Sequence, residues 1–262
     1  MERKAMHYVG IDVGSTATKV AVLDGGGALA RTLLCPTGFS SVDAAERLAQ
    51  QLLARGFDPR RLPCVATGYG RVAVPYADRV VTEITCHGKG AAFLFGGGGT
   101  VVDVGGQDTK VIVLRGGKVV KFAMNDKCSA GTGKFLEVMA NRLGVSQEEL
   151  ARLARMGAPT SISSMCTVFA ESEVISLIGK GTPREDIAYA VIESVVERVS
   201  VLVAQGKGAP YFLTGGLCDN GYFVERLGAR LGELVATEPR ARFAGAVGAA
   251  LLAEEGEGRH AG

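Results

Sequence analysis

The sequence predicts an α/β fold with two lobes. Three observations support this: the chain length, an internal duplication, and the alternation of strand-like and helix-like segments. The chain has 262 residues, and single hydrophobic cores stop growing at roughly 250–300 residues, so two small lobes suit it better than one core. We place the lobes at residues 1–96 and 97–262, with the last helix able to pack back on the first lobe.

The duplication repeats one strand–turn–strand unit. The segment DVGSTATKVAVL at 12–23 recurs as DVGGQDTKVIVL at 103–114, with 8 of 12 residues identical at an offset of 91. Each copy follows an apolar strand and continues into an alternating one, which is typical of a β-hairpin with a glycine-containing turn. Such turns expose backbone N–H groups that bind phosphate oxygens, and the Asp that opens each copy can hold Mg²⁺. A pair of purely structural hairpins is the alternative, but Asp at the same place in both favours a nucleotide.

The remaining segments alternate in the same way. Helical spacing covers 40–55, 83–95, 131–143, 146–155, 167–179, 183–205, 221–231 and 243–254, whereas 64–66, 119–124 and 211–216 are strand-like. Ser146 and Glu149 form a capping box, and Pro183 suits a first helical turn. The closing helix is rich in small residues, which allow another element to approach closely. The pattern predicts a parallel or mixed sheet in each lobe.

Composition excludes several classes of function. The net charge is +2, charges of both signs are interleaved, and Trp is absent, so nucleic acid is not an expected partner. No signal-peptide segment and no run of about 18 apolar residues is present, so we expect a cytoplasmic protein without a membrane span. The 37 glycines cluster in loops, and the six widely spaced cysteines of a cytosolic chain favour metal or redox roles over disulfides.

A second glycine-containing loop lies in MNDKCSAGTGKFLEV, residues 124–138, where Gly133 and Lys134 precede a helix. A nucleotide P-loop requires Gly six positions before the Lys and Ser or Thr directly after it. Cys128 and Phe135 occupy those places. The loop therefore either contacts phosphate in another way or presents a sulfur, and Lys134 is at least as well explained as a solvated helix residue.

These motifs resemble known ones. The turns at 12–16 and 103–108, the loop at 214–216 and the closing helix resemble, in order, the phosphate-1, phosphate-2 and adenosine motifs of the acetate and sugar kinase/Hsp70/actin superfamily, a duplicated ribonuclease-H-like ATPase fold. NDKCSAGTGKFLE and SMCTVFAESE resemble the two cysteine motifs of the 2-hydroxyacyl-CoA dehydratase activator and benzoyl-CoA reductase ATPase-subunit family. TGYGR at 67–71 and TEITCHGKGA at 82–91 are also similar to that family, so the resemblance spans nearly the whole chain.

The resemblance implies an ATPase coupled to electron transfer. It implies a homodimer with one [4Fe-4S] cluster at the subunit interface, held by Cys128 and Cys166 of each chain. Single low-potential electrons would pass to an iron–sulfur partner enzyme, a 2-hydroxyacyl-CoA dehydratase or a double-cubane cluster oxidoreductase, with ferredoxin or flavodoxin as the donor. One chain has no C-x-x-C pair or ferredoxin run and does not by itself indicate a cluster site, but two cysteines from each of two chains would suffice. Both cysteines stand at or just before predicted helix starts, where the helix dipole favours negative charge by roughly 0.3–1 kcal/mol.

In this interpretation ATP, later ADP, and Mg²⁺ lie between the lobes. Asp12 and Asp103 hold the metal, and Gln107 or Asp108 orients the attacking water. The expected nucleotide-binding residues are Gly14, Ser15, Thr16, Thr18, Lys19, Gly105, Gly106, Gly131, Thr132, Gly133, Gly215 and Gly216. Hydrolysis would then change the angle between the lobes and between the cluster helices of the dimer.

Several residues keep two interpretations. Lys19 and Lys110 either touch phosphate or point outward along their hairpins. An exposed face is favoured over partner contacts for Glu171 and Glu173. We expect the remaining cysteines to be small buried hydrophobes rather than ligands, with Cys86, beside His87, the least settled; the other three are Cys35, Cys64 and Cys218.

Two rival functions share the nucleotide motifs. A small-molecule kinase of the same superfamily, without a cluster, normally has a larger substrate lobe and an Asp base, and no such base stands out in this short chain. A nucleotide-dependent interaction module of the chaperone or actin type would need neither cysteine. Protein purified without oxygen should be brown only if the cluster is present.

Overall fold

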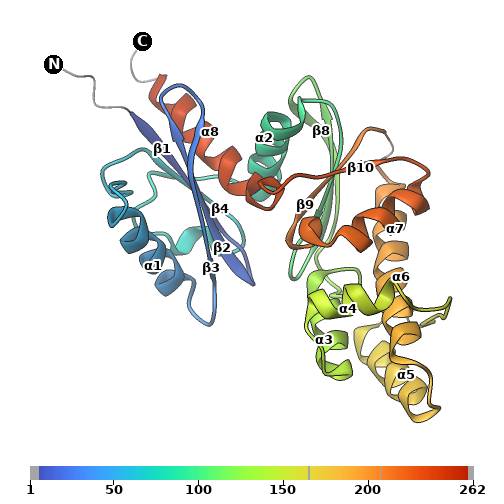
Figure 1. Cartoon of the computed structure of the whole chain (residues 1–262). Coiled ribbons are helices and arrows are strands. Elements are labelled where there is room, and N and C mark those ends of the chain that lie inside the picture. Colours follow the sequence, from blue (N-terminus) through green and yellow to red (C-terminus); the bar gives the residue numbers. More distant parts are fainter. Residues whose placement is uncertain (1–5, 165, 207, 259–262) are drawn as a thin grey trace. The chain divides into compact units, whose positions relative to one another are not determined.

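The computed structural model describes residues 6–164, 166–206 and 208–258 (Figure 1). Contacts divide the chain into two compact units. The first comprises the chain up to Gly98, the segment Leu114–Val120, and the chain from Arg240 onward. The second comprises Gly99–Val113 and Lys121–Pro239.

The first unit is built on a five-stranded mixed sheet in the order β3-β2-β1-β4-β5. Its strands are β1 (His7–Val13), β2 (Ala17–Asp24), β3 (Leu29–Pro36), β4 (Cys64–Thr67) and β5 (Arg79–Val80). Strands β1 and β2 are antiparallel with Asp12 opposite Lys19, so the hairpin that the first repeat predicts is confirmed. Strand β4 lies parallel to β1, which brings Thr67 level with Asp12.

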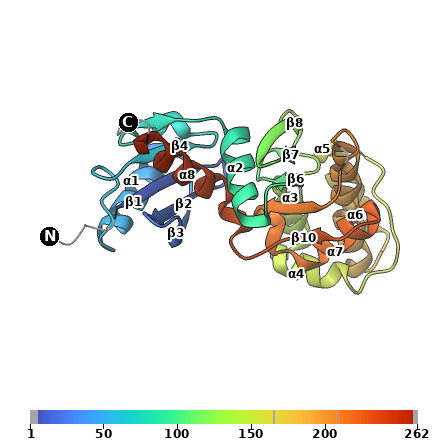
Figure 2. The same ribbon diagram turned by 90° about the horizontal axis from the view of Figure 1, so that it is seen from above.

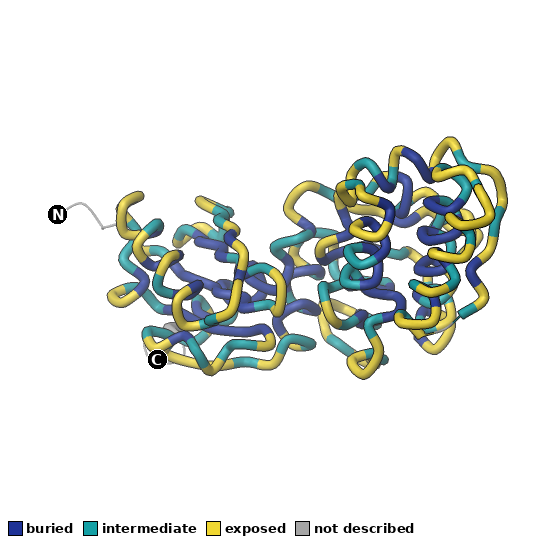
Figure 3. Tube along the Cα trace, turned by 90° about the horizontal axis from the view of Figure 1, so that it is seen from below, coloured by how far each residue is buried: buried dark blue, intermediate teal, exposed yellow. Residues whose placement is uncertain are grey.

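Alternating side chains of this sheet build two cores. Val9, Ile11 and Val13 pack against α1 (Ser41–Leu53), whereas Tyr8 belongs to the cluster on the other face, beneath α8 (Ala244–Gly258). This division follows from the two-residue period of a strand, which sends successive side chains to opposite faces. Figure 3 shows the resulting burial along the strands.

Helix α8 packs tightly on α2 (Glu83–Phe95), as Figure 2 shows. A Cβ atom at Gly90 would lie 1.8 Å from the Ala244 carbonyl oxygen, and one at Gly248 would lie 1.8 Å from the Cys86 carbonyl oxygen. No side chain fits at either place. The close approach that the small residues of the closing helix predict is therefore confirmed.

The second unit has a five-stranded sheet in the order β10-β9-β6-β7-β8. Its strands are β6 (Gly99–Val104), β7 (Thr109–Arg115), β8 (Lys118–Asn125), β9 (Tyr211–Gly215) and β10 (Val235–Ala236). Its helices are α3 (Gly133–Leu143), α4 (Gln147–Ala154), α5 (Thr167–Gly179), α6 (Arg184–Val203) and α7 (Gly221–Leu231). Of the short 3₁₀ turns, η1 (Arg71–Ala73) and η3 (Ala241–Phe243) belong to the first unit and η2 (Gly216–Asp219) to the second. The predicted bounds of α2, α5 and α7 are confirmed, and Ser146 Oγ caps α4 by accepting from the Glu149 N–H at 3.1 Å.

Helix α6 forms the centre of the helical layer, because α3, α4, α5 and α7 all pack against it. Helix α5 is mostly apolar, yet only Ala170 and Val174 of it are buried. Its exposed residues include Val168 and Phe169, which are 66% and 67% exposed. An apolar face of α5 thus lies open beside Cys166, which caps this helix.

No helix in the described part of the chain has the length and apolar character needed to cross a membrane.

Candidate nucleotide and cluster sites

The first repeat ends β1 on a buried carboxylate. Asp12 is 3% exposed, and Lys19 Nζ lies 3.5 Å from its Oδ2. Between them the turn closes through a hydrogen bond of 3.2 Å from the Gly14 N–H to the Ala17 carbonyl. A Cβ atom at Gly14 would lie 2.8 Å from that carbonyl oxygen. The glycine is therefore required by the turn, whose exposed tip is Ser15 and Thr16.

The second repeat forms the same arrangement of a buried Asp, a Lys and a glycine-containing turn. Asp103 is 2% exposed, and Lys110 Nζ lies 3.4 Å from its Oδ2 and 2.5 Å from Asp108 Oδ2. The Gly105 N–H donates to the Asp108 carbonyl at 2.9 Å. Each of these partners stands 91 residues after its counterpart in the first turn. Both lysines turn toward carboxylates, so the outward orientation considered for them is wrong; contact with phosphate stays a prediction.

A Thr-Gly pair lies beside each carboxylate, at the end of the neighbouring parallel strand. Thr214 Oγ1 donates to Asp103 Oδ1 at 2.8 Å, and Thr67 is level with Asp12. Gly68 and Gly215 have φ values of +94° and +83°, and Cβ atoms there would lie 2.6 Å and 2.9 Å from the respective Asp Oδ1 atoms. Sequence reasoning named Gly215 as a site residue but missed the equivalent Thr67 and Gly68. The repeated Thr-Gly after an apolar strand was the available signal.

The start of α8 and one residue of α2 complete the surroundings of Asp12. A Cβ atom at Gly245 would lie 2.8 Å from Asp12 Oδ2 and 2.7 Å from Cε1 of His87, a buried residue. The neighbouring Cys86 is fully buried, and burial raises the pKa of its thiol to about 11. Cys86 is therefore a packing residue, as the favoured interpretation held, whereas His87 lies next to the carboxylate.

Both carboxylates fit a role in binding Mg²⁺. Each is buried at the carboxyl end of a strand, the edge at which open α/β sheets bind ligands. Glycines keep side chains away from the oxygens that a hydrated Mg²⁺ would use. The lysines lie at 3.4–3.5 Å, longer than a tight charged hydrogen bond, so the carboxylate oxygens are not committed to them alone.

The first cysteine loop runs from β8 to α3. Cys128 is exposed, and Asn125 Nδ2 donates to the carbonyls of Cys128 and Ala130 at 3.0 and 3.1 Å. Gly131 has a φ of +86°, which no helix contains, so α3 begins only at Gly133. The predicted helix start at residue 131 is wrong. Cys128 therefore lies upstream of the first turn, and the helix-dipole argument holds for Cys166 alone.

This loop is bonded directly to the second hairpin turn. The N–H groups of Gly133 and Lys134 donate to the carbonyls of Gly105 and Gly106, each at 2.9 Å. Thr132 Oγ1 also donates to the Gly106 carbonyl at 3.2 Å. The predicted nucleotide-binding residues of this loop therefore lie against the phosphate-2 turn. Lys134 itself pairs with Glu137 at 2.9 Å on the surface, which agrees with a solvated residue.

The second cysteine loop precedes α5, whose N-cap is the exposed Cys166. The Glu173 carboxylate accepts hydrogen bonds from the N–H groups of Ser163 and Ser164 at 3.0 and 3.1 Å. Burial raises the pKa of Glu173, but the hydrogen bonds from Ser163 and Ser164 outweigh burial and hold it below its ordinary value. Glu171 accepts from Arg142 Nε at 3.0 Å. Both glutamates remain partly exposed, and these bonds also tie α5 to its surroundings.

The two cysteine loops also contact each other. Ser129 Oγ and Thr167 Oγ1 are hydrogen-bonded at 2.9 Å, which joins the residue after Cys128 to the residue after Cys166. Cys128 and Cys166 are the exposed thiols, and the other four, Cys35, Cys64, Cys86 and Cys218, are buried as expected. Among the residues described, no group of three or more His, Cys, Asp or Glu side chains could hold a metal ion. The donor set therefore fits a [4Fe-4S] cluster only if two chains each contribute two thiolates.

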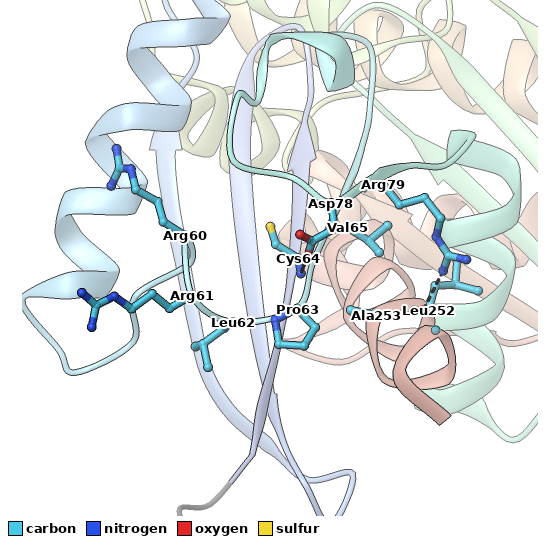
Figure 4. A pocket seen from close by; sticks show the side chains of 11 residues that line it. Arg60, Arg61, Leu62, Pro63, Cys64, Val65, Asp78, Arg79, Leu252 and Ala253 are labelled. Atoms are coloured by element: carbon cyan, nitrogen blue, oxygen red, sulfur yellow. Dashed lines mark hydrogen bonds between the residues drawn. The ribbon is translucent and has the colours of Figure 1, made fainter. Parts of the chain in front are cut away.

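One pocket lies away from the two hairpin turns and the two cysteine loops. It has a volume of about 390 Å³ and is lined by Arg60, Arg61, Cys64, Asp78 and Arg79, among others (Figure 4). Arg79 Nη2 is already engaged by the Leu252 carbonyl at 2.6 Å. Because Cys64 begins β4 and Thr67 ends it, the pocket lies at the opposite end of that strand from Asp12. The pocket is not part of the candidate site.

The duplicated Asp–Lys hairpins on two mixed sheets define an ATPase of the actin and Hsp70 fold class. A model of the BadF/BadG/BcrA/BcrD ATPase family matches residues 9–253, and the chain belongs to this family. It is 44% identical over 250 residues to the uncharacterized protein YjiL of Escherichia coli K12, across 95% of this chain and 97% of the relative. It is 41% identical over 253 residues to the (R)-2-hydroxyglutaryl-CoA dehydratase activating ATPase of Acidaminococcus fermentans, with the same coverage of 95% and 97%.

Solved structures agree. The activator of the 2-hydroxyisocaproyl-CoA dehydratase from Clostridium difficile, with bound ADPNP, has a TM-score of 0.91 at 35% identity and covers 98% of this chain and 97% of its own. A ROK family glucokinase from Streptomyces griseus has a TM-score of 0.55 at 15% identity over 95% and 99% of the two chains, and shares the fold alone. The predicted family and the duplicated ribonuclease-H-like ATPase fold are both confirmed.

Proposed function

We propose that this chain is an ATP-dependent activator that uses ATP hydrolysis to drive single low-potential electrons to an iron–sulfur partner enzyme. The observation that carries the proposal is the hydrogen-bonded contact between the Gly105–Gly106 turn and the Cys128 loop. A kinase or a chaperone-type ATPase has no need for an exposed thiol beside a phosphate-binding turn. A nucleotide-gated redox protein does.

The nucleotide residues act by position and charge. Asp12 and Asp103 would hold Mg²⁺ through water, and backbone N–H groups of the two turns would bind phosphate oxygens. Mg²⁺, when bound, would neutralise charge that develops on the phosphoryl group. Gln107 is exposed at the tip of its turn, whereas Asp108 is paired with Lys110 at 2.5 Å. Gln107 is therefore the better candidate to orient the attacking water. The remaining turn and loop residues would contact the nucleotide: Gly14, Ser15, Thr16, Thr18, Lys19, Gly215 and Gly216.

The exposed cysteines would complete an electron-transfer site in a homodimer. Cys128 and Cys166 of each chain would supply the four thiolates of one [4Fe-4S] cluster, which when bound accepts and donates one electron at a time. The open apolar face of α5 beside Cys166 supports burial against a second chain, because exposed apolar patches mark interaction surfaces. The N-terminus of α5 places a positive dipole end at Cys166 and favours the negative charge there.

The partner enzyme is inferred from the relatives. The protein from Acidaminococcus fermentans is named for (R)-2-hydroxyglutaryl-CoA dehydratase and covers almost all of this chain. We propose a 2-hydroxyacyl-CoA dehydratase or a double-cubane cluster oxidoreductase as the partner, and ferredoxin or flavodoxin as the electron donor. None of the six cysteines forms a disulfide in the described structure, which suits the reducing cytoplasm.

Anaerobic purification tests the proposal. We expect the wild-type protein to contain about four irons per two chains, from the cluster stoichiometry. With a reduced donor and the partner enzyme present as acceptor, it should pass electrons to that enzyme only while it hydrolyses ATP. Cys128→Ala and Cys166→Ala should lose the iron and the electron transfer but keep nucleotide binding, whereas Cys218→Ala, a buried control, should keep all three. A colourless wild-type protein that hydrolyses ATP would contradict the proposal.

A further inference from the structure

We propose that Arg198 is a positioning residue that ties the Cys166 loop to the Cys128 loop, so that a movement of the phosphate-2 turn reaches both cysteines together. The inference rests on the proposed function, because it assigns a role within that electron-transfer site. Arg198 lies on α6, far along the chain from both cysteine motifs and outside every motif that sequence reasoning singled out.

The guanidinium of Arg198 contacts the Cys166 loop. Its Nη2 donates to the Ser164 carbonyl at 2.5 Å, two residues before Cys166. Its Nη1 donates to the Ser194 carbonyl at 2.8 Å and also bonds the Ser194 hydroxyl, so α6 fixes the side chain at one end. Arginine presents several donors in one rigid plane, which allows it to bond both elements at once.

The same side chain contacts the Cys128 loop. The guanidinium carbon lies 5.2 Å from the ring centroid of Phe135, a fully buried residue of α3, within the range of a cation–π contact. A Cβ atom at Gly131 would lie 3.1 Å from the Arg198 Cβ. The stem therefore packs on the backbone between Cys128 and α3, while the head group holds the segment before Cys166.

The Cys128 loop is in turn bonded to the nucleotide-binding hairpin. Thr109 Oγ1 donates to the Gly131 carbonyl at 2.7 Å, and the Gly133 N–H donates to Gly105. A displacement of the turn is therefore transmitted to Gly131, against which Arg198 packs. The Cys166 loop is hydrogen-bonded to α6 and to the Cys128 loop. Its links run through Arg198 and through the Ser129–Thr167 hydroxyl pair.

Cysteine alkylation of the full chain, stripped of iron and kept anaerobic, tests the coupling without a cluster. The rates at Cys128 and Cys166 are measured by mass spectrometry in ADP and in a non-hydrolysable ATP analogue. In the wild-type protein, we expect the alkylation rate of each cysteine to differ at least threefold between the two nucleotides. Arg198→Met should lower the ratio of the two alkylation rates at Cys166 at least twofold while Cys128 keeps its response, because it removes one of the two links between the Cys166 loop and the Cys128 loop.

Two further variants control the result. Arg230→Met removes the same charge from an exposed pair with Glu197 at 3.3 Å and should leave both ratios unchanged. Arg198→Lys keeps the charge but lacks the planar guanidinium group, and should lower the ratio of the two alkylation rates at Cys166 at least twofold. This variant replaces Arg198→Met in the test if Arg198→Met does not fold. A wild-type ratio at Cys166 in Arg198→Lys, or equal losses at both cysteines, would overturn the proposal.

The iron content of the same proteins, measured before the iron is removed, distinguishes a failure of the proposed function from a failure of the role of Arg198. If the wild-type protein binds no iron, the proposed function fails whatever the alkylation shows. If the wild-type protein binds iron and the Cys166 ratio of the Arg198 variants stays at the wild-type value, only the role of Arg198 fails. In the iron-loaded protein we also expect Arg198→Met to shift the cluster's midpoint potential to more negative values, because a positive charge near the thiolates favours the reduced form.

Discussion

At the scale of single residues, the buried Lys110 explains why the Asp103 carboxylate can be held out of water. Lys110 is 3% exposed and faces both Asp103 and Asp108. Removing one partner of a buried ion pair leaves an uncompensated charge, which typically costs about 3–5 kcal/mol. The lysine is thus a structural requirement of the turn before any nucleotide binds.

We therefore expect Lys110→Met to lower the free energy of unfolding by about 3–5 kcal/mol. Urea denaturation measures this change. Lys134→Met is the matched control, because its pair with Glu137 is on the surface and exposed pairs contribute about 0–1 kcal/mol. Equal stability of the two variants would show that Asp103 does not depend on the lysine.

The buried cysteine thiols should react more slowly with alkylating reagents than the exposed ones. Burial raises the pKa of Cys64 to about 12 and that of Cys86 to about 11, and both side chains are almost inaccessible. The thiolate is the reactive form. In iron-free native protein at pH 8, we expect iodoacetamide to modify Cys128 and Cys166 and to spare Cys64 and Cys86. Modification of Cys64 at a rate similar to that of Cys166, read by mass spectrometry, would contradict this assignment.

The Glu173 carboxylate gives a pH dependence of known sign. Its pKa in the folded protein is held below the ordinary value of 4.5, so its contribution to stability is present above that value. The contribution is lost as the pH falls through the lowered pKa. We expect Glu173→Gln to unfold at lower urea than the wild type at pH 7, and the difference to shrink below pH 4.5. Glu148→Gln, on an exposed helix face, is the control; a difference that grows in acid would refute the assignment.

At the scale of elements, the periodicity of the sequence predicted most helices to within a residue or two. The misses have local causes. Strand β3 was not predicted, because it is an edge strand whose residues are mainly half-buried or exposed and show no clean alternation. The start of α3 was placed too early, because the positive φ of Gly131 is a property of the folded loop and not of the residue type alone.

The crossing of α2 and α8 is the contact least tolerant of change. We expect Gly248→Ala to destabilise the protein by several kcal/mol or to prevent folding, because the added carbon would overlap the Cys86 carbonyl. Gly256→Ala, in the same helix, meets only the end of Arg79 at 3.8 Å and should be neutral or slightly stabilising. Thermal unfolding compares the two; similar melting temperatures would mean that the helices can separate at this crossing without loss.

At the scale of the whole molecule, the sequence identified many candidate site residues but did not predict their contacts. Asp12 and Asp103 were predicted because the duplication that contains them can be recognised from the order of residues alone. The inward turn of Lys19 and Lys110, the anchoring of the Cys166 loop by Glu173 and the contact of Arg198 with Ser164 were not found. These depend on side-chain directions and on partners up to 34 residues away, which no local pattern encodes.

In the proposed function, two chains would share one inorganic centre through Cys128 and Cys166 of each. A single chain presents two exposed thiols, which is half of what a cube requires. The apolar face of α5 beside Cys166 is the surface that a second chain would cover.

Native mass spectrometry of the anaerobically purified protein tests this claim most directly. We expect a species of two chains with one [4Fe-4S] cluster, and we expect Cys166→Ala to be free of the cluster. A monomer that carries its own cluster, or a dimer whose cluster survives the loss of Cys166, would contradict it.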